Sequence, residues 1–534
     1  MREISVAAGN TDFDNSDIIG APRMGFRPDG QGGVMTGSKG VAVGRVWWLV
    51  LALVLVSSGI TAAPLWFDNP AQRQAGQELR KQVNFMAAAN VSHQFNELQR
   101  LLNQEALTLR QQSELLTEAY LLIQGFNQTM ASRPIGADQL GQMPLHLTSP
   151  EGSAFELATA VSQQRLIQLV IDLEPRGSDY LAARHWVEQL QQMVHLNWPR
   201  FTATRLIEPH QRHVEVEQIR VVLKLLNDYQ GPVLGQEYDA DLVAAVQRFQ
   251  RRHGLAADGV IGPKTRSWLS MSPAVRAQRL ARNILRQSHD RRWFAQEYLL
   301  VNIPDFSLRW VTPEGQRFQS RVIVGRNSRR TPRMATEMVS VVVNPSWNVP
   351  RSIVRKDLIP KIRRNGDYLA QQHFDAYDWQ GSPVEKTPQQ WQQASYGRFP
   401  FRLSQRPGNR NALGRYKFHL TNNQAIYLHD TPKKSLFDKP SRAFSSGCVR
   451  VQDADLLARQ LVQYGDISEA RFVRSRRSNA TQWFKMQRPL PVYLVYWSAW
   501  MGQDHKPRYR RDLYHQEGDL DHKMTIAMGH QLSR

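Results

Sequence analysis

Residues 425–451 read AIYLHDTPKKSLFDKPSRAFSSGCVRV, and this stretch indicates both a fold and a chemistry. One apolar run ends at His429, and a second begins directly after Cys448. Short apolar runs bounded by Pro, Ser and Gly are typical of β-strands. A strand, a loop and a return strand would bring the imidazole against the thiol.

Cys448 is the single cysteine of the chain, which excludes an intramolecular disulfide and a cysteine-cluster metal site. Gly447 permits a sharp turn just before it, and successive N–H groups around such a turn can form an oxyanion hole. An adjacent imidazole can lower the pKa of a thiol and create a nucleophilic ion pair. The residues therefore predict a Cys/His acyl-transfer site. Arg450 either binds a substrate carboxylate there or pairs with a structural acid.

The composition is that of a globular protein of several domains. A chain of 534 residues suggests three to four domains at roughly 150 residues each. Hydrophobic residues are 41% and charged residues 22%, which excludes a mostly disordered chain. Lys plus Arg is 68 and Asp plus Glu is 47, a net charge of +21. That excess favours a polyanionic partner: nucleic acid, an anionic membrane surface or an acidic polymer.

The N-terminal region indicates export. Residues 46–67 carry no charge and follow Arg45, and they are long enough to span a bilayer. Thr61, Ala62 and Ala63 resemble a cleavage site for a signal peptide. A retained signal anchor and a cleaved signal peptide both place the bulk of the chain outside the cytoplasm. A lone thiol kept in an oxidising compartment is either inert or reactive.

Helical patterns occupy the first half of the folded chain. Leu and aromatic residues recur at helical spacing within 71–213. In the compact unit 214–270, Asp239 is expected to cap a helix that Gly254 ends, and Pro263 to begin a short one. The basic segment 271–293 is expected to form a solvated connecting helix.

Beyond residue 294 the spacing of apolar residues changes from helical to alternating. Alternating β-branched stretches bounded by Pro, Gly and Asn predict short strands up to about residue 515. A basic insertion at 351–412, rich in Gln, Trp and Tyr, interrupts them, and long insertions near a site are often lids. Residues 516–534 are expected to form a frayed tail.

The segment LVAAVQRFQRRHGLAADGVIGPKTRSWL at 242–269 resembles the peptidoglycan-binding domain of the three-helix type. The resemblance covers residues 214–270. It implies affinity for cell-wall glycan or stem peptide, although in some members the module is only a scaffold.

The motifs His429-Asp430-Thr431 and Ser445-Ser446-Gly447-Cys448-Val449-Arg450 resemble the signature of the L,D-transpeptidases. Asp430 stands where the family usually has Gly, and Ser446 where it usually has a second His. The stretches VIVGRNSRRTP (322–332), VVNPSWNVP (342–350) and QRPGNRNALGRYKF (405–418) are similar to the large, export-anchored L,D-transpeptidases of Gram-negative bacteria.

The resemblance implies an α+β protein in which a helical N-terminal scaffold and a small three-helix wall-binding module precede a mainly β catalytic domain with a helical capping insertion. The expected parts are a disordered segment (1–43), a signal anchor (44–67), the helical scaffold (71–213), the peptidoglycan-binding domain (214–270), a connecting helix (271–293), the catalytic domain (294–515, capping insertion about 351–412) and the tail (516–534).

It also implies a reaction that needs neither a metal nor an organic cofactor. The Cys448 thiolate attacks a tetrapeptide stem, D-alanine leaves with a proton from His429, and an amine of a second stem resolves the thioester into a 3→3 cross-link. A carbapenem-type β-lactam is expected to trap Cys448. The resemblance places Gly447, Ser446, Ser445 and Asp430 in support of the oxyanion or the loop, and Arg450, Tyr427, Asn411 and Trp347 in substrate binding.

The implied partners are donor and acceptor tetrapeptide stems, the inner membrane through the N-terminal segment, and proteins of cell-wall synthesis. The implied location is the periplasm. No nucleic acid is expected, because the positive charge is dispersed and the chain carries an export segment. Three alternatives stay open: an L,D-carboxypeptidase, a ligase that joins a protein to the wall, and a non-catalytic wall-binding scaffold.

Overall fold

The computed structural model describes residues 65–137, 140, 145–518 and 520. The expected disordered segment 1–43 and all but the last residues of the expected anchor 44–67 lie outside this part of the chain. Within the described part, no helix is both long enough and apolar enough to cross a bilayer.

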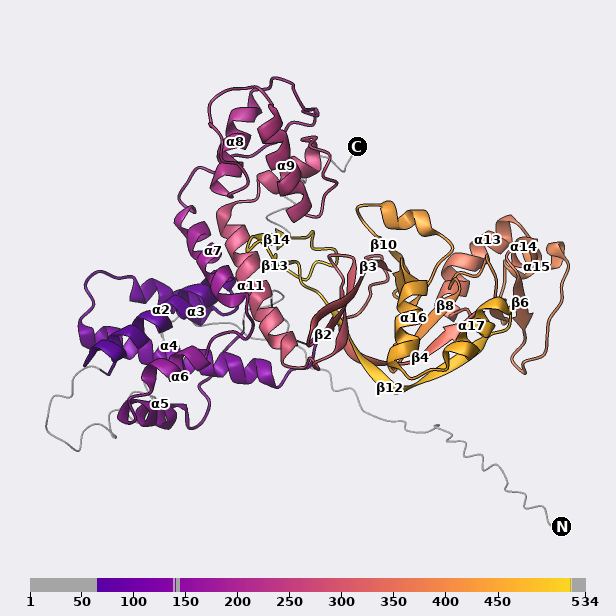
Figure 1. Cartoon of the computed structure of the whole chain (residues 1–534), viewed down its shortest axis with the longest axis horizontal. Helices are drawn as coiled ribbons and strands as arrows, with labels where there is room; N and C mark the ends of the chain where they lie inside the picture. Colours follow the sequence, from indigo (N-terminus) through magenta and orange to yellow (C-terminus); the bar gives the residue numbers. More distant parts are fainter. Residues whose placement is uncertain (1–64, 138–139, 141–144, 519, 521–534) are drawn as a thin grey trace, which may run out of the picture. The chain divides into compact units, whose positions relative to one another are not determined.

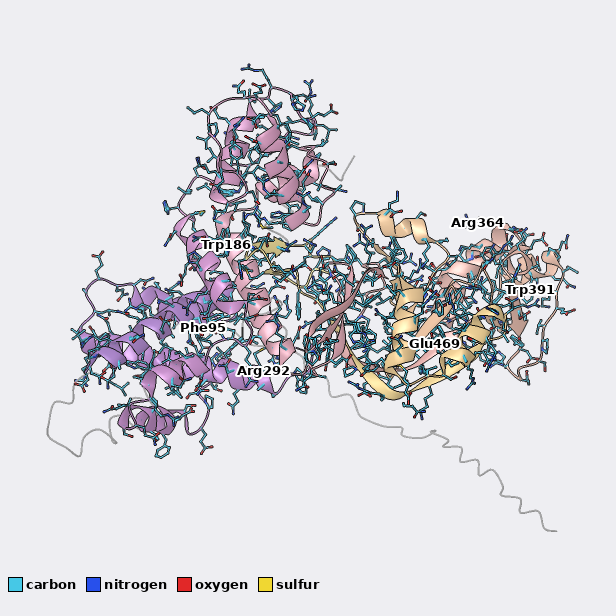
Figure 2. All side chains as sticks on the ribbon, viewed as in Figure 1. Phe95, Trp186, Arg292, Arg364, Trp391 and Glu469 are labelled. Carbon is cyan, nitrogen blue, oxygen red and sulfur yellow. The ribbon has the colours of Figure 1, made fainter. Side chains whose placement is uncertain are left out.

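The helical scaffold expected at 71–213 consists of several separate helices (Figure 1). Polar caps divide them: Asn69 and Thr108 each form a capping box with the Gln three residues later, which satisfies the first free N–H groups of a helix. The helices are α2 (Pro70–Ala89), α3 (His93–Leu102), α4 (Leu109–Ala131), α5 (Ser153–Ser162), α6 (Leu166–Asp172) and α7 (Tyr180–Gln192). Phe95 and Trp186, labelled in Figure 2, are buried in their shared core.

The expected three-helix module is confirmed, as α8 (Glu215–Leu225), α9 (Ala240–Arg252) and α10 (Pro263–Leu269). Asp239 Oδ1 accepts a hydrogen bond of 2.8 Å from the Leu242 N–H. Gly254 follows α9 with φ of 67°, the left-handed conformation that ends helices. Pro263 is the first residue of α10.

Helix α11 (Pro273–Arg291) is buried, so the expectation of a solvated connecting helix is wrong. Arg276, Arg279 and Arg286 are each 0% exposed. Buried guanidinium groups are tolerated only when acceptors surround them, and backbone carbonyls supply several here. Arg276 Nε donates to the Met271 carbonyl at 3.0 Å, and Arg282 Nε to the Ala89 carbonyl at 3.2 Å.

A buried carboxylate completes the surroundings of α11. Glu517 is 0% exposed and its Oε1 lies 2.8 Å from Arg286 Nη1. Asn283 Nδ2 and Ser498 Oγ donate to the same oxygen at 3.0 and 2.6 Å. Glu517 therefore belongs to the core, which corrects the expectation that a frayed tail begins at residue 516.

The C-terminal half is mainly β. Within the described residues, nine strands form one sheet in the order β10-β3-β11-β9-β8-β4-β12-β1-β2, and β2 also pairs with β3, so the sheet closes on itself. Its strands are β1 (Tyr298–Asn302), β2 (Ser307–Thr312), β3 (Gly315–Gly325), β4 (Met334–Val343), β8 (Tyr416–Leu420), β9 (Leu428–His429), β10 (Ala443–Ser445), β11 (Val449–Val451) and β12 (Gln482–Val495).

Helices and a short hairpin surround this sheet. Helix α16 (Ala454–Tyr464) packs on β4 and β8, and α17 (Glu469–Arg477) packs on α16. The hairpin β13 (Ala499–Met501) and β14 (Pro507–Tyr509) contributes side chains to the core of the helical half instead. The α+β organisation expected from the sequence is thus confirmed.

The insertion has its own core and is less helical than expected. Its strands β5 (Trp347–Asn348), β6 (Phe374–Tyr377) and β7 (Arg402–Gln405) form a separate sheet. The helices are α12 (Arg351–Ile353), the π-helical turn η1 (Val354–Leu358), α13 (Ile359–Arg364), α14 (Tyr368–Gln371) and α15 (Pro388–Ala394). Trp391 is buried among Ile362, Leu369 and other apolar residues of this unit (Figure 2).

Replacing Glu517 by Ala should destabilise the protein by about 3–5 kcal/mol, because removal of one member of a buried ion pair leaves the other charge uncompensated. Burial raises the pKa of Glu517, but Arg286, Arg279 and Arg282 together lower it to about 2. The stabilisation is therefore present above the ordinary carboxyl pKa and lost as the pH falls towards 2. Urea unfolding at pH 7 measures it. The exposed Glu385→Ala serves as control and should stay within about 0.5 kcal/mol of the parent; a Glu517 variant equal to that control would contradict the prediction.

Candidate active site

The two short strands β9 and β11 bring the predicted nucleophile and base to one face of the sheet. They pair in parallel, with Val449 opposite Leu428 and Arg450 opposite His429. Continuing this register puts Cys448 opposite Tyr427. Because side chains alternate between faces along a strand, Tyr427, His429, Cys448 and Arg450 share a face. Diagonal Cα positions on such neighbours lie roughly 8 Å apart, a gap that an imidazole and a thiol span.

His429 is buried and held in one orientation. Its Nδ1 lies 2.5 Å from the carbonyl oxygen of Asp430, to which a protonated Nδ1 donates, leaving Nε2 as the free base. Burial, followed by the charge of Arg450, lowers the pKa of His429 to about 3. The imidazole is therefore neutral at physiological pH. The backbone carbonyl of the residue after the histidine therefore orients the imidazole ring.

Cys448 is partly exposed and protonated at rest. Its Sγ lies 3.7 Å from the Ala425 carbonyl, and no hydrogen bond joins it to His429 within the described chain. Burial raises the pKa of the thiol, while hydrogen bonds from Tyr427 and the charges of Lys417 and Arg450 oppose that rise. The resting pair is a neutral thiol and a neutral imidazole rather than the ion pair that the sequence predicts. The reason is that burial disfavours both charged forms.

Ser445 and Thr331 brace the loop that carries the thiol. Ser445 Oγ donates to the Cys448 carbonyl at 2.5 Å and accepts from the Gly447 N–H at 3.1 Å. Thr331 Oγ1 donates to the Gly447 carbonyl at 2.7 Å. Gly447 has φ of 123°, which other residues adopt only with strain. Its N–H is already bound, so in this conformation Gly447 shapes the loop instead of contributing to the oxyanion hole expected there. The Cys448 N–H forms no hydrogen bond within the described residues and is available.

Ser446 ties the same loop to the insertion. Its Oγ accepts from Arg329 at 2.8 Å and from Arg326 at 3.3 Å. Both arginines also pair with Asp357 of η1, Arg329 through two hydrogen bonds. The hydroxyl of Ser446 therefore joins an arginine network at the position where the family usually has a histidine.

Asp430 supports the loop from the other side. Its Oδ2 accepts from the Arg415 N–H at 2.9 Å, and its Oδ1 pairs with Lys434 at 2.6 Å. A Cβ on Gly414 would collide with the Asp430 carboxylate. The side chain thus fixes the turn before β8, consistent with a role in loop support.

Three predicted substrate-binding residues lie around the thiol. Arg450 forms no ion pair among the described residues, and its Nε is buried without an acceptor. The Tyr427 ring centroid lies 5.6 Å from that of His429. Burial and then Cys448 raise the pKa of Tyr427, while the neighbouring Trp347 side chain, whose Nε1 is buried without a hydrogen-bond partner, opposes that rise. Trp347 therefore faces the site from β5 of the insertion.

Asn411, the fourth predicted substrate-binding residue, is buried. It is 1% exposed, and its Nδ2 donates to the carbonyls of Pro345, Gln405 and Arg406 at 3.0, 3.2 and 2.9 Å. Its Oδ1 accepts from the Leu413 N–H at 2.8 Å. No amide hydrogen is left for a substrate, so Asn411 is a brace of the insertion and not the substrate contact expected from the sequence.

Lys417 is a residue of the site that the sequence analysis missed. It stands opposite His429 on β8, and its Nζ lies 4.5 Å from the Tyr427 ring centroid. No carboxylate pairs with it within the described chain. Burial lowers the pKa of Lys417, whereas Cys448 raises it. The alternation of YKFHL at 416–420 was the available signal, since it places Lys417 and His419 on one face.

Replacing Lys417 by Met should raise the pKa of the Cys448 thiol, because the substitution removes a cation that favours the thiolate. If that pKa rises by about one, the thiolate population at neutral pH falls about tenfold. The pH dependence of alkylation by iodoacetamide reports this cleanly, since Cys448 is the single thiol. Lys485→Met, at an exposed position on β12, should leave the profile unchanged. Identical profiles for both variants would remove Lys417 from the site.

Comparison with known proteins finds matches for two parts of the chain. A family model described as "L,D-transpeptidase catalytic domain" matches residues 296–468, and one described as "Putative peptidoglycan binding domain" matches residues 212–269. A curated protein of Haemophilus influenzae, "Putative L,D-transpeptidase", is 39% identical over 203 residues, or 38% of this chain. The alignment spans 41% of that relative's length.

Solved structures show weaker likeness. An L,D-transpeptidase from Xylanimonas cellulosilytica is 14% identical with a TM-score of 0.17, over 55% of this chain and 98% of the other. An L,D-transpeptidase from Stackebrandtia nassauensis is 15% identical with a TM-score of 0.21. The match covers 50% of this chain and 91% of the other. These scores carry no argument about the fold. The matches to family models are specific to two parts of the chain: residues 296–468 are similar to an L,D-transpeptidase catalytic domain, and residues 212–269 to a peptidoglycan-binding domain.

Proposed function

We propose that this protein is an L,D-transpeptidase that forms 3→3 cross-links in peptidoglycan. The observation that carries the proposal is a part-exposed Cys448 on the same sheet face as a neutral, oriented His429, inside a catalytic domain of that family. The wall-binding module supports a cell-wall substrate.

The first half-reaction transfers an acyl group to the sulfur. The Cys448 thiol gives its proton to His429 Nε2 as the sulfur attacks the carbonyl between the third residue of a tetrapeptide stem and its terminal D-alanine. The Cys448 N–H is available to the oxyanion. His429 then protonates the departing amine of D-alanine, and a thioester remains on Cys448.

The second half-reaction releases the enzyme. The side-chain amine of a diamino acid on an acceptor stem attacks the thioester, and His429 removes the proton of that amine. The thiolate leaves and recovers a proton from the imidazole. Arg450, which pairs with no acid among the described residues, suits a stem carboxylate. The two steps pass through a covalent intermediate formed on the chain's own residues.

The cellular setting belongs to the same proposal. A substrate in the wall requires a position outside the cytoplasm, which in a Gram-negative cell is the periplasm. Attachment to the inner membrane by residues 44–67, and association with proteins of wall synthesis, extend the proposal beyond the described part of the chain.

The Cys448→Ala variant should form no cross-linked dimers from purified tetrapeptide monomers and no adduct with a carbapenem-type β-lactam, because both need the sulfur. Intact-mass spectrometry detects the adduct, and separation of muropeptides detects the dimers. An unchanged unfolding curve shows that the fold is intact, and exposed Ser441→Ala is the control. An adduct that persists in Cys448→Ala would overturn the assignment. Release of D-alanine without dimers from the parent would instead indicate a carboxypeptidase.

Carbapenem acylation of the parent should be nearly independent of pH between 5 and 8. His429 is deprotonated above its pKa of about 3, and the thiol is protonated below its own raised pKa, so the reacting forms keep constant populations across this range. In His429→Gln the rate should fall about 10²–10⁴-fold and increase about tenfold per pH unit, because only thiolate then attacks. Stopped-flow measurement of the acylation rate tests this, and a parent rate that already climbs tenfold per unit would exclude His429 as the base.

A further inference from the structure

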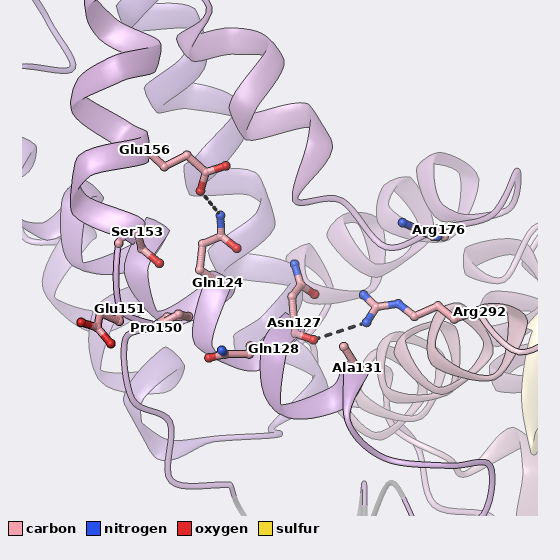
Figure 3. Close-up of a pocket in the computed structure, with 11 residues that line it drawn as sticks. Gln124, Asn127, Gln128, Ala131, Pro150, Glu151, Ser153, Glu156, Arg176 and Arg292 are labelled. Carbon is pink, nitrogen blue, oxygen red and sulfur yellow. Dashed lines mark hydrogen bonds between the residues drawn. The ribbon is translucent and has the colours of Figure 1, made fainter.

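The helical scaffold contains a polar groove that none of the residues described above uses. Its volume is about 680 Å³, within the range of about 300–1,000 Å³ typical of sites for small ligands. Its walls come from α4, the start of α5, the loop after α6 and the end of α11. Figure 3 shows that its charged side chains are sorted by sign, with two arginines on one side and two glutamates on the other.

The basic side is formed by Arg176 and Arg292. Neither forms an ion pair with a carboxylate within the described chain. Arg292 donates to the Asn127 carbonyl at 3.3 Å, and its Nε is buried without an acceptor. Ser288 Oγ fixes the backbone at Arg176 by accepting its N–H at 2.6 Å. Burial and then Arg176 lower the pKa of Arg292. Two neighbouring cations without an acid form a site that favours an anion.

The acidic side is formed by Glu151 and Glu156, which are both exposed and have no basic partner among the described residues. Glu156 Oε2 accepts from Tyr120 Oη at 2.8 Å and from Gln124 Nε2 at 2.9 Å. These neutral donors hold the carboxylate in place without cancelling its charge. The side chain of Gln128, between the two sides, forms no hydrogen bond within the described chain and can bind a peptide group.

We propose that this groove binds a short peptide that carries both a free carboxylate and a free amine, with the carboxylate on Arg176 and Arg292 and the amine on Glu151 and Glu156. Opposite charges sorted to opposite sides fix the direction in which such a ligand lies. A simple anion would satisfy only the arginines.

The identity of the ligand rests on the proposed function. A tetrapeptide stem with a diamino acid has several carboxylates and one free side-chain amine, so it fits the sorted charges. Holding one stem away from the thiol increases the local concentration of stems near the catalytic domain. The scaffold then contributes to substrate capture in addition to its structural role.

Photo-cross-linking in the full chain tests the proposal. The probe is a synthetic tetrapeptide stem with a diazirine group, and the protein is the Cys448→Ala variant, which cannot consume it. Peptide mass spectrometry should find the label in 124–131 or 150–156. Arg176→Glu should reduce this label about tenfold. Acetylation of the side-chain amine of the probe's diamino acid should reduce it by a similar factor. Glu151→Lys should also reduce the label in the groove, independently of the arginines. Arg110→Glu, an exposed substitution elsewhere on α4, should leave the label unchanged.

Three outcomes would overturn the inference: label confined to the wall module or the catalytic domain, groove label that survives Arg176→Glu, or groove label insensitive to acetylation of the amine. The last would mean that any carboxylate binds, which competition by acetate would show. Carbapenem adduct formation on the parent cysteine, measured separately in Arg176→Glu, should be unchanged. A failure of the groove is thereby distinguished from a failure of the proposed activity.

Discussion

The parallel pairing of β9 with β11 is the constraint on which the site depends. These strands contain two and three residues, too few to be stable alone. Pairing with β8 on one side and β3 on the other makes both of them interior strands of a closed sheet. Their register then decides which side chains meet: a slip of one residue would send Cys448 and His429 to opposite faces. The loop hydrogen bonds of Ser445 and Thr331 fix the same register at the turn.

The electrostatics of the site follow from that placement. Lys417 and Arg450 both lie on the thiol's face, and neither pairs with a carboxylate in the part of the chain that the structure describes, so the site has an excess of positive charge there. Such surroundings disfavour an imidazolium and favour negative charge that develops on sulfur or oxygen during the reaction. A neutral thiol and a neutral base in the resting enzyme are chemically consistent with acyl transfer. The nearby cations would stabilise the negative charge that develops in the transition state. The same cations are suited to the carboxylates of a stem peptide.

The sequence predicts what depends on local pattern and fails where long-range packing decides. Asp239, Gly254 and Pro263 act within one turn of helix, and their roles are confirmed. Arg286 looks like a solvated residue because two of its acceptors, the Tyr496 carbonyl and the Glu517 carboxylate, come from segments more than 200 residues away. Lys417 enters the site through strand pairing. Asn411 lies within a motif of the family, yet three carbonyls from the surrounding turns occupy its amide, and no spacing rule reveals that.

The substitution of Ser for His at residue 446 changes how the loop is connected to the insertion. A histidine there could donate or accept and could titrate, whereas a serine hydroxyl stays neutral and can accept hydrogen bonds from two arginines at once. Arg326 and Arg329 both donate to this hydroxyl, and Asp357 pairs with both arginines from the insertion side. Any displacement of the insertion therefore has to break a bidentate ion pair or pull on the residue next to the nucleophile. The geometry of the thiol and the position of the insertion are consequently coupled through one hydroxyl group.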